Sequence, residues 1–371
     1  MTAAILLEAA LKTGAVLAFL LGLAGPLTWA ERRQSAMIQD RLGPVMANVG
    51  PLRFWGLLHV MADALKMLWK EDFVPPKADK LLHALAPMIA MFPALVTFAV
   101  VPFGDTVCSG QLWEVVPKSG TCAEGIEMQI APLNVGILWL FAIAGTGVVG
   151  AALAGYSSNN KYSLLGGLRA ASQMVSYEVT MGLAIVGCLM VYGTVELPEM
   201  VRWQDAHVWG IVAQPLAFIL FFTAAVAETK RVPFDLPEGE SEIVGGYFTE
   251  YSGMKFGMFF TGEFIEVIVA SAVLTTLFWG GWNLPFLCRD GVHLPEWAGG
   301  WHLALEHFWV TLIQIGAFIG KTVAMCWFQL MVRWTVPRFR YDQLMRLGWR
   351  YLLPVSLLNI VITGIVMLAW T

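Results

Sequence analysis

Eight long apolar segments restrict the fold of this sequence more than any other feature. They cover residues 10–30, 81–102, 131–155, 172–192, 208–227, 256–281, 308–332 and 351–370. Each is long enough to cross about 30 Å of hydrocarbon as a helix. Isolated strands cannot satisfy their backbone hydrogen bonds in lipid, so helices are expected. The sequence therefore predicts an all-α integral membrane protein with eight transmembrane helices, forming a single membrane domain over residues 1–371.

The composition agrees with a membrane protein and argues against two other classes. Charged residues make up 13% of the chain, about half the ~25% typical of soluble proteins. The net charge is only -4 and no tract rich in Lys or Arg is present, which argues against nucleic-acid binding. Glu8 and Lys12 precede the apolar stretch Thr13 to Ala30 and "WAERRQ" includes its end and the residues that follow it. We therefore expect a retained first helix and no cleaved signal peptide.

The distribution of basic residues predicts the orientation of the helices. Most of the Lys and Arg residues fall in four alternate connections, 31–80, 156–170, 228–255 and 333–350. Connections rich in Lys and Arg stay in the cytoplasm. The cytoplasmic face therefore holds segment 31–80 and the acidic loop 228–255. Both termini and the loops 103–130 and 282–307 are expected on the opposite, periplasmic face.

Segment 31–80 is predicted to contain an amphipathic helix. His59, Asp63, Lys66 and Lys70 follow one another at steps of four, three and four residues, which places them on one narrow helical face. The rest of this helix is mostly apolar. Either it lies on the lipid surface with a solvated polar stripe, or the stripe turns toward a cavity lined by protein.

Ionisable residues inside the apolar segments require an explanation. Glu178, Glu263, Glu266 and Lys321 lie within predicted spans, and Glu228 closes another. Such groups cost about 2.5–3.5 kcal/mol each at mid-membrane. They are interpreted either as structural ion pairs and side chains that reach an interface, or as a buried chain that holds and passes protons.

The stretch "AETKRVPFDLPEGESEIVGGYFTEY", residues 227–251, gathers acids in this weakly charged chain. Asp235 and Glu238 have the spacing of an acidic helix N-terminus. Glu240, Glu242 and Glu250 continue the series beside an aromatic run, which helix capping does not explain. Carboxylates grouped at low dielectric can exchange protons near neutral pH. We therefore expect a proton-handling entrance at the cytoplasmic surface.

Cysteine and histidine patterns argue against a redox cofactor in this chain. The five Cys form no Cys-x-x-Cys, so no iron–sulfur cluster, zinc site or other metal site is predicted. The six His lie in loops or near the ends of spans, which does not suit haem. Cys108 and Cys122 share the loop 103–130, where a disulfide is one option. A pairing with Cys288, or three free thiols, remains open.

Five motifs together resemble one known family. They are "AETKRVPFDLPEGESEIVGGYFTEYSG", "GGLRAASQMVSYEV", "AERRQSAMIQDRLGP", "ADALKMLWKED" and "VPRFRYDQLMRLGWRYLLP". In order and over nearly the whole chain, they resemble the quinone-chamber membrane subunit of respiratory complex I, the proton-pumping NADH:quinone oxidoreductase. That subunit is called H in bacteria and 1 in mitochondria. Val45, Met46 and His59 depart from the family pattern near the mouth of the quinone channel.

The resemblance implies roles for three groups of residues. Near the quinone channel and chamber it places Glu31, Arg32, Arg41, Asp63, Arg231, Phe234, Asp235 and Glu238. Along the proton path it places Glu178, Glu228, Glu240, Glu242, Glu250, Glu263 and Lys321. On the face that docks the peripheral arm we expect Lys66, Lys70, Glu71, Arg169, Arg338, Arg340 and Asp342.

The resemblance also implies cofactors, partners and location. Quinone, either ubiquinone or menaquinone, is the expected substrate, and iron–sulfur clusters and FMN belong to partner subunits. Expected partners are the peripheral-arm subunits, including the carrier of the terminal cluster and the quinone-site subunit, the small and antiporter-like membrane subunits, and lipid. A bacterial inner membrane is expected, with the mitochondrial inner membrane as the alternative, and the isolated chain should have no activity.

Two other functions remain open from the sequence. Membrane-bound nickel–iron hydrogenases and formate hydrogenlyases contain a similar subunit that needs no quinone, but the run "EGESEIVGGYFTEYSG" is more similar to the quinone enzymes. A proton-coupled secondary transporter would be expected to show an internal repeat and broken helices around a mid-membrane site.

Overall fold

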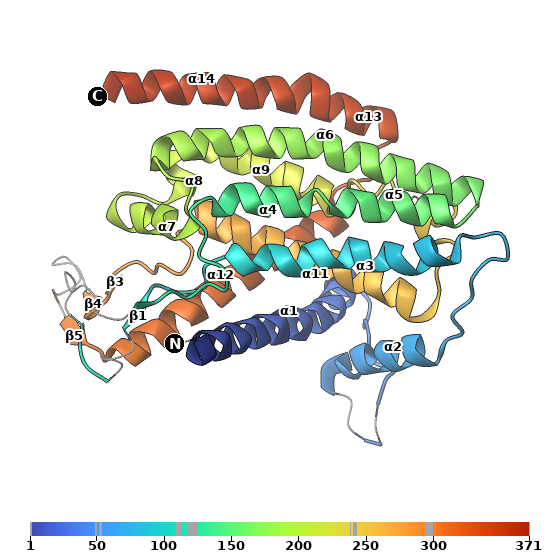
Figure 1. Cartoon of the computed structure of the whole chain (residues 1–371), viewed down its shortest axis with the longest axis horizontal. Helices are drawn as coiled ribbons and strands as arrows, with labels where there is room; N and C mark the ends of the chain where they lie inside the picture. The colour runs from blue at the N-terminus through green and yellow to red at the C-terminus, as the bar shows by residue number, and fades with distance from the viewer. Residues whose placement is uncertain are drawn as a thin grey trace.

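Long helices run side by side along the length of the computed structural model (Figure 1). The structure describes residues 2–48, 50–51, 54–108, 113–116, 125–237, 239, 243–293, 300 and 302–370. The main helices are α1 (Thr2–Ile38), α3 (Lys80–Thr97), α4 (Gly136–Ala144), α5 (Gly147–Ser157), α6 (Lys161–Tyr192), α9 (Pro215–Glu228), α11 (Gly253–Phe278), α12 (His307–Thr335) and α14 (Leu353–Trp370). Within these residues, seven helical segments are long and apolar enough to span a membrane. The all-α membrane fold is confirmed.

The fifth predicted span, 208–227, corresponds to two shorter helices. α8 (Gly210–Ala213) ends at Gln214, and Pro215 begins the apolar helix α9. Proline suits a first helical position because its missing N–H would have no partner there. The third predicted span is also divided, between α4 and α5, at Gly145 and Thr146. The break at Gly145 lies next to the carboxylate of Glu178, which is described below.

Helix α11 forms the centre of the bundle and α6 forms a second axis. α11 packs against α3, α12 and α1, and α6 packs against α5, α9 and α14. The side chain of Asn160 accepts a hydrogen bond from the N–H of Tyr162 at the start of α6, and Gly193 ends this helix in the left-handed region. α6 therefore begins 11 residues before the predicted span at 172, so residues 161–171 extend the helix beyond the predicted core.

Short elements occupy the connections between the long helices. α2 (Leu58–Trp69) follows the single turn Phe54–Gly56, and α7 (Leu197–Ala206) precedes α8. α13 (Tyr341–Arg346) runs through a π-helical turn, Leu347–Leu352, into α14. α12 ends at Thr335, two residues before Pro337, as the proline predicts. Two small antiparallel sheets were not predicted; they contain β1 (Val107–Cys108), β2 (Gly125–Ile126), β3 (Leu287–Cys288), β4 (Gly291–His293) and β5 (His302–Ala304).

The states of Cys108 and Cys288 distinguish among the predicted disulfide pairings and free thiols. Cys108 is disulfide-bonded, so the prediction of three free thiols is wrong. Cys288 is free, so a pairing that uses it is wrong as well. Cys122, the expected partner of Cys108, lies outside the described residues.

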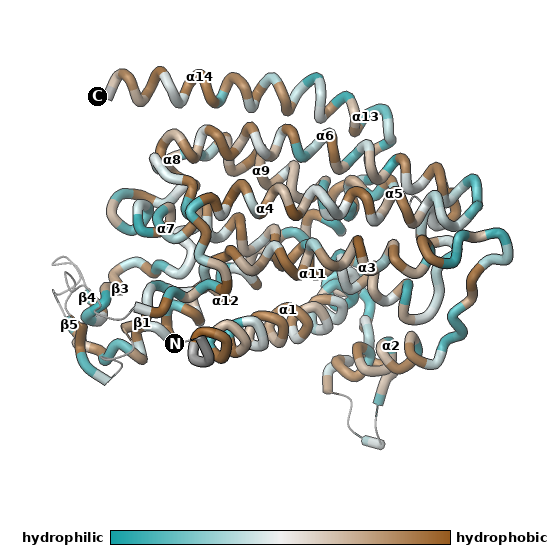
Figure 2. Tube along the Cα trace, viewed as in Figure 1, coloured by the Kyte–Doolittle hydropathy of each residue, from teal (hydrophilic) through white to brown (hydrophobic). Residues whose placement is uncertain are grey.

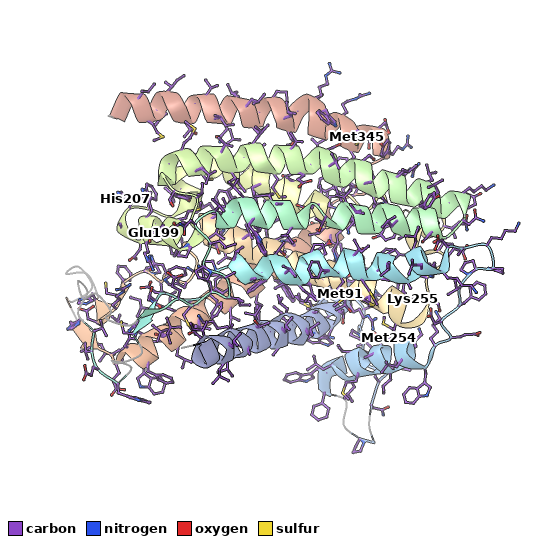
Figure 3. All side chains as sticks on the ribbon, in the orientation of Figure 1. Met91, Glu199, His207, Met254, Lys255 and Met345 are labelled. Atoms are coloured by element: carbon purple, nitrogen blue, oxygen red, sulfur yellow. The ribbon has the colours of Figure 1, made fainter. Side chains whose placement is uncertain are left out.

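The two ends of the bundle differ in what they carry. Both chain termini lie at the end with α7 and the small sheets, and α2 lies toward the opposite end (Figure 1). Apolar residues colour the middle of the long helices and polar residues gather toward the ends (Figure 2). Figure 3 shows Glu199 and His207 at the first end and Lys255 at the second. We call the end with the termini the outer end, and the end with α2 and the described residues 243–252 the inner end.

Impermeant thiol labelling is expected to distinguish the two ends. In a Cys288→Ser background, Lys77→Cys should react from the cytoplasmic side, because Lys77 is exposed at the inner end. His207→Cys, exposed at the outer end, should react from the periplasmic side. The measurement compares inverted with right-side-out vesicles. The opposite pattern would overturn the predicted orientation. Labelling of one variant in both kinds of vesicle would instead show that the vesicles are leaky.

Candidate functional site

A carboxylate that is mostly shielded from solvent joins three segments at the inner end. Glu31, near the end of α1, accepts from the guanidinium of Arg231 at 2.6 Å and lies 2.7 Å from that of Arg333 on α12. Arg231 is only 6% exposed, and its guanidinium lies 3.9 Å from the ring centre of Phe264 on α11. We call Glu31, Arg231 and Arg333 the Glu31 junction.

The segment that follows α9 is fixed from both sides. The side-chain amide of Gln173, fully buried on α6, donates to the carbonyls of Ala227 and Phe234, at 2.7 Å each. The ring of Phe234 stacks on that of Phe339 with centres 5.5 Å apart. Asp235, predicted at a helix N-terminus, is buried and accepts from Arg338 at 2.7 Å. These contacts join residues 227–235 to the segment between α12 and α13.

The amphipathic helix α2 is attached through half of its polar stripe. The carboxylate of Asp63 lies 2.6 Å from the guanidinium of Arg32, and the ring of His59 accepts from the N–H of Ala47. Lys66 and Lys70 are exposed. No residue of α2 is buried by this chain, so its apolar face remains available to lipid or to a partner subunit.

A cavity of about 70 Å³ lies in the bundle where α9 ends. This volume has room for about two or three water molecules at ~30 Å³ each. Its polar lining comes from Glu228, Thr97, Thr229 and Glu266, and its apolar wall includes Leu140, Met174, Met181, Phe221 and Val273. Lys230, 5% exposed, reaches Glu266 at 3.4 Å. We call this space the Glu228 cavity.

Successive cations on the chain therefore contact different acids. Lys230 contacts Glu266 beside the Glu228 cavity, while Arg231 contacts Glu31 in the junction. Lys230 has a φ of +56°, in the left-handed region that residues other than glycine seldom adopt. The backbone at Lys230 and Arg231 thus links Glu266, beside the Glu228 cavity, to Glu31 in the Glu31 junction.

Other predicted acids along the bundle have hydrogen-bond partners of their own. Glu263 accepts from the phenol of Tyr247 at 3.3 Å, and Glu250 accepts from the amide of Asn160 at 2.7 Å. Burial raises the pKa of Tyr251, although hydrogen bonds to the serines at 157 and 158 oppose this effect. Tyr251 therefore remains a neutral phenol, stacked on His83 with ring centres 4.1 Å apart.

Glu178 and Lys321 mark two different levels of the bundle. Glu178 lies against Gly145, where α4 and α5 separate, and a Cβ atom there would lie 2.7 Å from its carboxylate. Electrostatic interaction reaches Glu228 from both Glu178 and Glu266. The ammonium of Lys321 instead donates to the carbonyls of Trp279, Gly281 and Asn283 beyond the end of α11.

The predicted site residues thus fall into several groups. Glu178 and Glu228 lie near one another, Glu263 and Glu250 follow toward the inner loop, and Lys321 lies apart near the outer end of α11. Arg41 is exposed and donates to Ser35. Glu238, Glu240 and Glu242 lie outside the described residues. Of the predicted docking residues, Arg169 is half-buried against Tyr341, and the exposed ones are Lys66, Lys70, Glu71, Arg338, Arg340 and Asp342.

Two residues of these groups, Lys230 and Arg333, had no site role predicted from the sequence and were counted only as basic residues of inner connections. Glu266 was included among the buried charges that could pass protons, but not among the residues that the resemblance places on the proton path. Its spacing supports a place beside Glu263: the two residues are three positions apart, so they lie on one side of α11.

Comparison with known proteins identifies the family. Residues 11–364 match the NADH dehydrogenase family. A relative from Flavobacterium psychrophilum, named as the H subunit of NADH-quinone oxidoreductase, is 42% identical over 99% of both chains. The chain belongs to this family. Relatives named as the same subunit from Cytophaga hutchinsonii, 41% identical over 97% of this chain and 96% of its own, and from Thermomicrobium roseum, 44% identical over 94% and 93%, agree.

Membership of this family confirms the resemblance carried by the five motifs. The chain is a membrane subunit of the complex I type, within an oxidoreductase assembly. Bacterial relatives and long apolar helices support a place in the bacterial inner membrane. The relatives match over nearly their full length, so the family assignment covers the Glu31 junction and the Glu228 cavity alike.

Proposed function

We propose that the inner end of this chain forms the access channel and chamber for quinone, and that buried carboxylates couple quinone reduction to proton translocation. Quinone, which appears in the names of the relatives, is the substrate, and FMN and iron–sulfur clusters reside in partner subunits. The membrane subunit then acts as part of a proton-translocating complex and has no activity alone. Both termini face the periplasm in this proposal.

The Glu228 cavity is the observation that carries the proposal. It places two carboxylates and a buried lysine in an apolar wall, next to the backbone turn that leads to the Glu31 junction. Ionisable groups inside a membrane bundle mark proton relays or ion paths. A reaction at the junction that moves Arg231 also moves Lys230, because the two residues are adjacent. That displacement changes the charge that Glu228 and Glu266 experience.

The channel is proposed along the cations and aromatic rings at the inner end. Arg32 and Asp63 join α1 to α2, and Phe234 and Asp235 lie beside Phe339 and Arg338. An aromatic and cationic wall suits a quinone ring with two carbonyl oxygens. Glu238, Arg41 and the Glu31 junction complete the proposed lining. The proton path continues through Glu178, Glu263, Glu250, Glu240 and Glu242, with Lys321 toward the outer end.

The partners follow from the exposed groups at the same end. Lys66, Lys70, Glu71, Arg169, Arg338, Arg340 and Asp342 are proposed to dock the peripheral arm, which carries the terminal iron–sulfur cluster and the quinone-site subunit. The apolar faces of α1 and α14, which are the least buried long helices of the described residues, are proposed to meet lipid and the small and antiporter-like membrane subunits.

Glu228→Gln tests the coupling role directly. Glutamine keeps the shape and loses the ionisable proton, so the assembled complex should remain while NADH oxidation with quinone falls several-fold. Electron transfer from NADH to an artificial acceptor that reacts at the peripheral arm should stay normal. The measurement is the ratio of these two activities in membranes, normalised to the amount of complex.

Glu199→Gln provides the matched control for this ratio. Glu199 lies at the outer end and pairs with Arg202, far from the proposed path (Figure 3). Burial lowers the pKa of Arg202, but Asp105 and Glu199 outweigh it and raise that pKa. In the control, Arg202 keeps its contact with Asp105 at 3.3 Å. A wild-type ratio in Glu228→Gln would contradict the coupling role. Hydrogen oxidation without quinone in the purified complex would favour the hydrogenase alternative.

A further inference from the structure

The small outer sheet brings four potential metal ligands together. Cys288 and Gly291 are paired across β3 and β4, so Asp290 lies in the turn between these strands. His293 follows on β4, and His302 on β5 is its direct cross-strand partner. Side chains of directly opposed strand residues lie close together on one face. The sheet therefore brings a thiol, a carboxylate and two imidazoles into one small region.

The distances within this cluster fit a metal centre that needs little rearrangement. Ligand atoms of Cys288, Asp290 and His293 all lie within 4.8 Å of one another. A ring nitrogen of His293 is 2.8 Å from one oxygen of Asp290, and that of His302 is 4.0 Å from the other. Ligand atoms around tetrahedral zinc lie about 3.4–3.8 Å apart, given metal–ligand bonds of about 2.0–2.3 Å.

We propose that Cys288, Asp290, His293 and His302 bind a divalent metal ion of the zinc class. A thiolate with two imidazoles and a carboxylate is the donor set that zinc accepts. Calcium and magnesium instead prefer oxygen ligands throughout. The two imidazole rings stack with centres 4.2 Å apart, which keeps the two histidines side by side at the proposed site.

The hairpin is also held in place for binding. Arg289, the other turn residue, contacts Asp105 at 2.8 Å, and the N–H of Leu305 donates to the carbonyl of Asp290. Asp105 belongs to the segment that leads to the disulfide-bonded Cys108. Bound metal would thus tie β5 to a hairpin that is already attached to the bundle. The spacing Cys-x-Asp-x-x-His lacks the Cys-x-x-Cys pattern, which explains why no metal site was predicted from the sequence.

A bare histidine–aspartate ion pair is the simpler interpretation of this cluster. It accounts for Asp290 and His293, but it gives no role to the thiol of Cys288. The thiol therefore distinguishes the two interpretations, because only a metal centre would shield it. Cys188 and Cys326, the other free cysteines among the described residues, are buried in the bundle.

Protection of Cys288 from maleimide tests the proposal in the detergent-solubilised complex. Labelling of the peptide that contains Cys288 is followed by mass spectrometry, with and without micromolar Zn²⁺ or Cd²⁺. In the wild type, metal should slow labelling on the order of tenfold or more, because the thiolate that would attack maleimide is then bound to the metal. A chelator should restore the original rate.

Variants separate metal binding from simple burial of the thiol. His302→Ala, His293→Ala and Asp290→Asn should each lose most of the protection, while His207→Ala, an exposed histidine at the same end, should keep it. Asp290→Asn preserves side-chain shape, and an unchanged rate without metal shows that the hairpin is intact. Unchanged labelling of the wild type with metal, or full protection in the His293→Ala/His302→Ala double variant, would overturn the proposal.

Discussion

Glu31→Gln is expected to remove most of the assembled complex from the membrane. The substitution takes away the carboxylate that two guanidiniums share at the inner end, one of them almost completely buried. Breaking a buried ion pair from one side costs about 3–5 kcal/mol, because a charge stays behind in a poor solvent. That cost is a large part of the total stability of about 5–15 kcal/mol typical of folded proteins. The measurement is the amount of complex on native gels, together with its thermal unfolding.

A more exposed ion pair at the same end gives the control for Glu31. Asp72 is half-exposed and lies 2.9 Å from Lys255, and such pairs contribute about 0–1 kcal/mol. Asp72→Asn should therefore leave the amount of complex near the wild-type level. The double variant Glu31→Gln/Arg333→Gln should recover part of the loss, because it removes one of the charges left behind. Wild-type levels in Glu31→Gln alone would contradict the structural role of the junction.

Gly166→Ala is expected to be the second most damaging change. A Cβ atom on Gly166 of α6 would lie 2.6 Å from the Cα of Gly246 and 2.7 Å from the backbone nitrogen of Tyr247. Both contacts are with backbone, which cannot rotate away as a side chain can. Gly246 itself has a φ of +55° and faces the carbonyl of Pro237, so it cannot easily give way. Overpacking costs about 1–3 kcal/mol or more.

Gly182→Ala on the same helix is the matched control. A Cβ atom there meets nothing within 4 Å, and alanine favours a helix over glycine by up to about 1 kcal/mol. The two variants differ only in what the added methyl group touches. Thermal unfolding and protease sensitivity of residues 243–252 should therefore separate them. Equal behaviour of the two variants would show that the inner loop is free to move away from α6.

The spans were predictable because length and apolarity alone decide whether a segment crosses lipid. All eight predicted segments coincide with helices, including the shorter α9. The breaks at Gly145 and Gln214 were not predictable, because averaged hydropathy does not respond to one or two residues. The helical start of α6 at Lys161 was missed for a similar reason: "KYSLLGGLRAA" is too polar and glycine-rich to count as a span, yet it packs against the inner loop.

The site was predictable in its residue types and less so in its pairings. Apolar surroundings made Glu178, Glu228 and Glu263 conspicuous, and family motifs pointed to Glu31 and Arg231. Their partners depend on contacts between distant parts of the chain, such as Glu31 with Arg333 and Asp235 with Arg338. Nothing in local spacing reports such contacts. The outer cluster was missed because its four proposed ligands come from three strands and a turn of a sheet that the apolar pattern does not reveal.

The Glu31 junction also sets an order of events during synthesis. Arg231 follows Glu31 by 200 residues, and Arg333 comes later still. At about 5–20 residues per second, the ribosome needs roughly 10–40 s to supply even the first of these partners. Throughout that interval the carboxylate has neither guanidinium. The 37 residues of α1 exceed the ~20 needed to cross the hydrocarbon. Glu31, near the end of this helix, can therefore stay hydrated in the headgroup region until its partners are made. Among the described helices, α1 is thus synthesised early but fixed in position late.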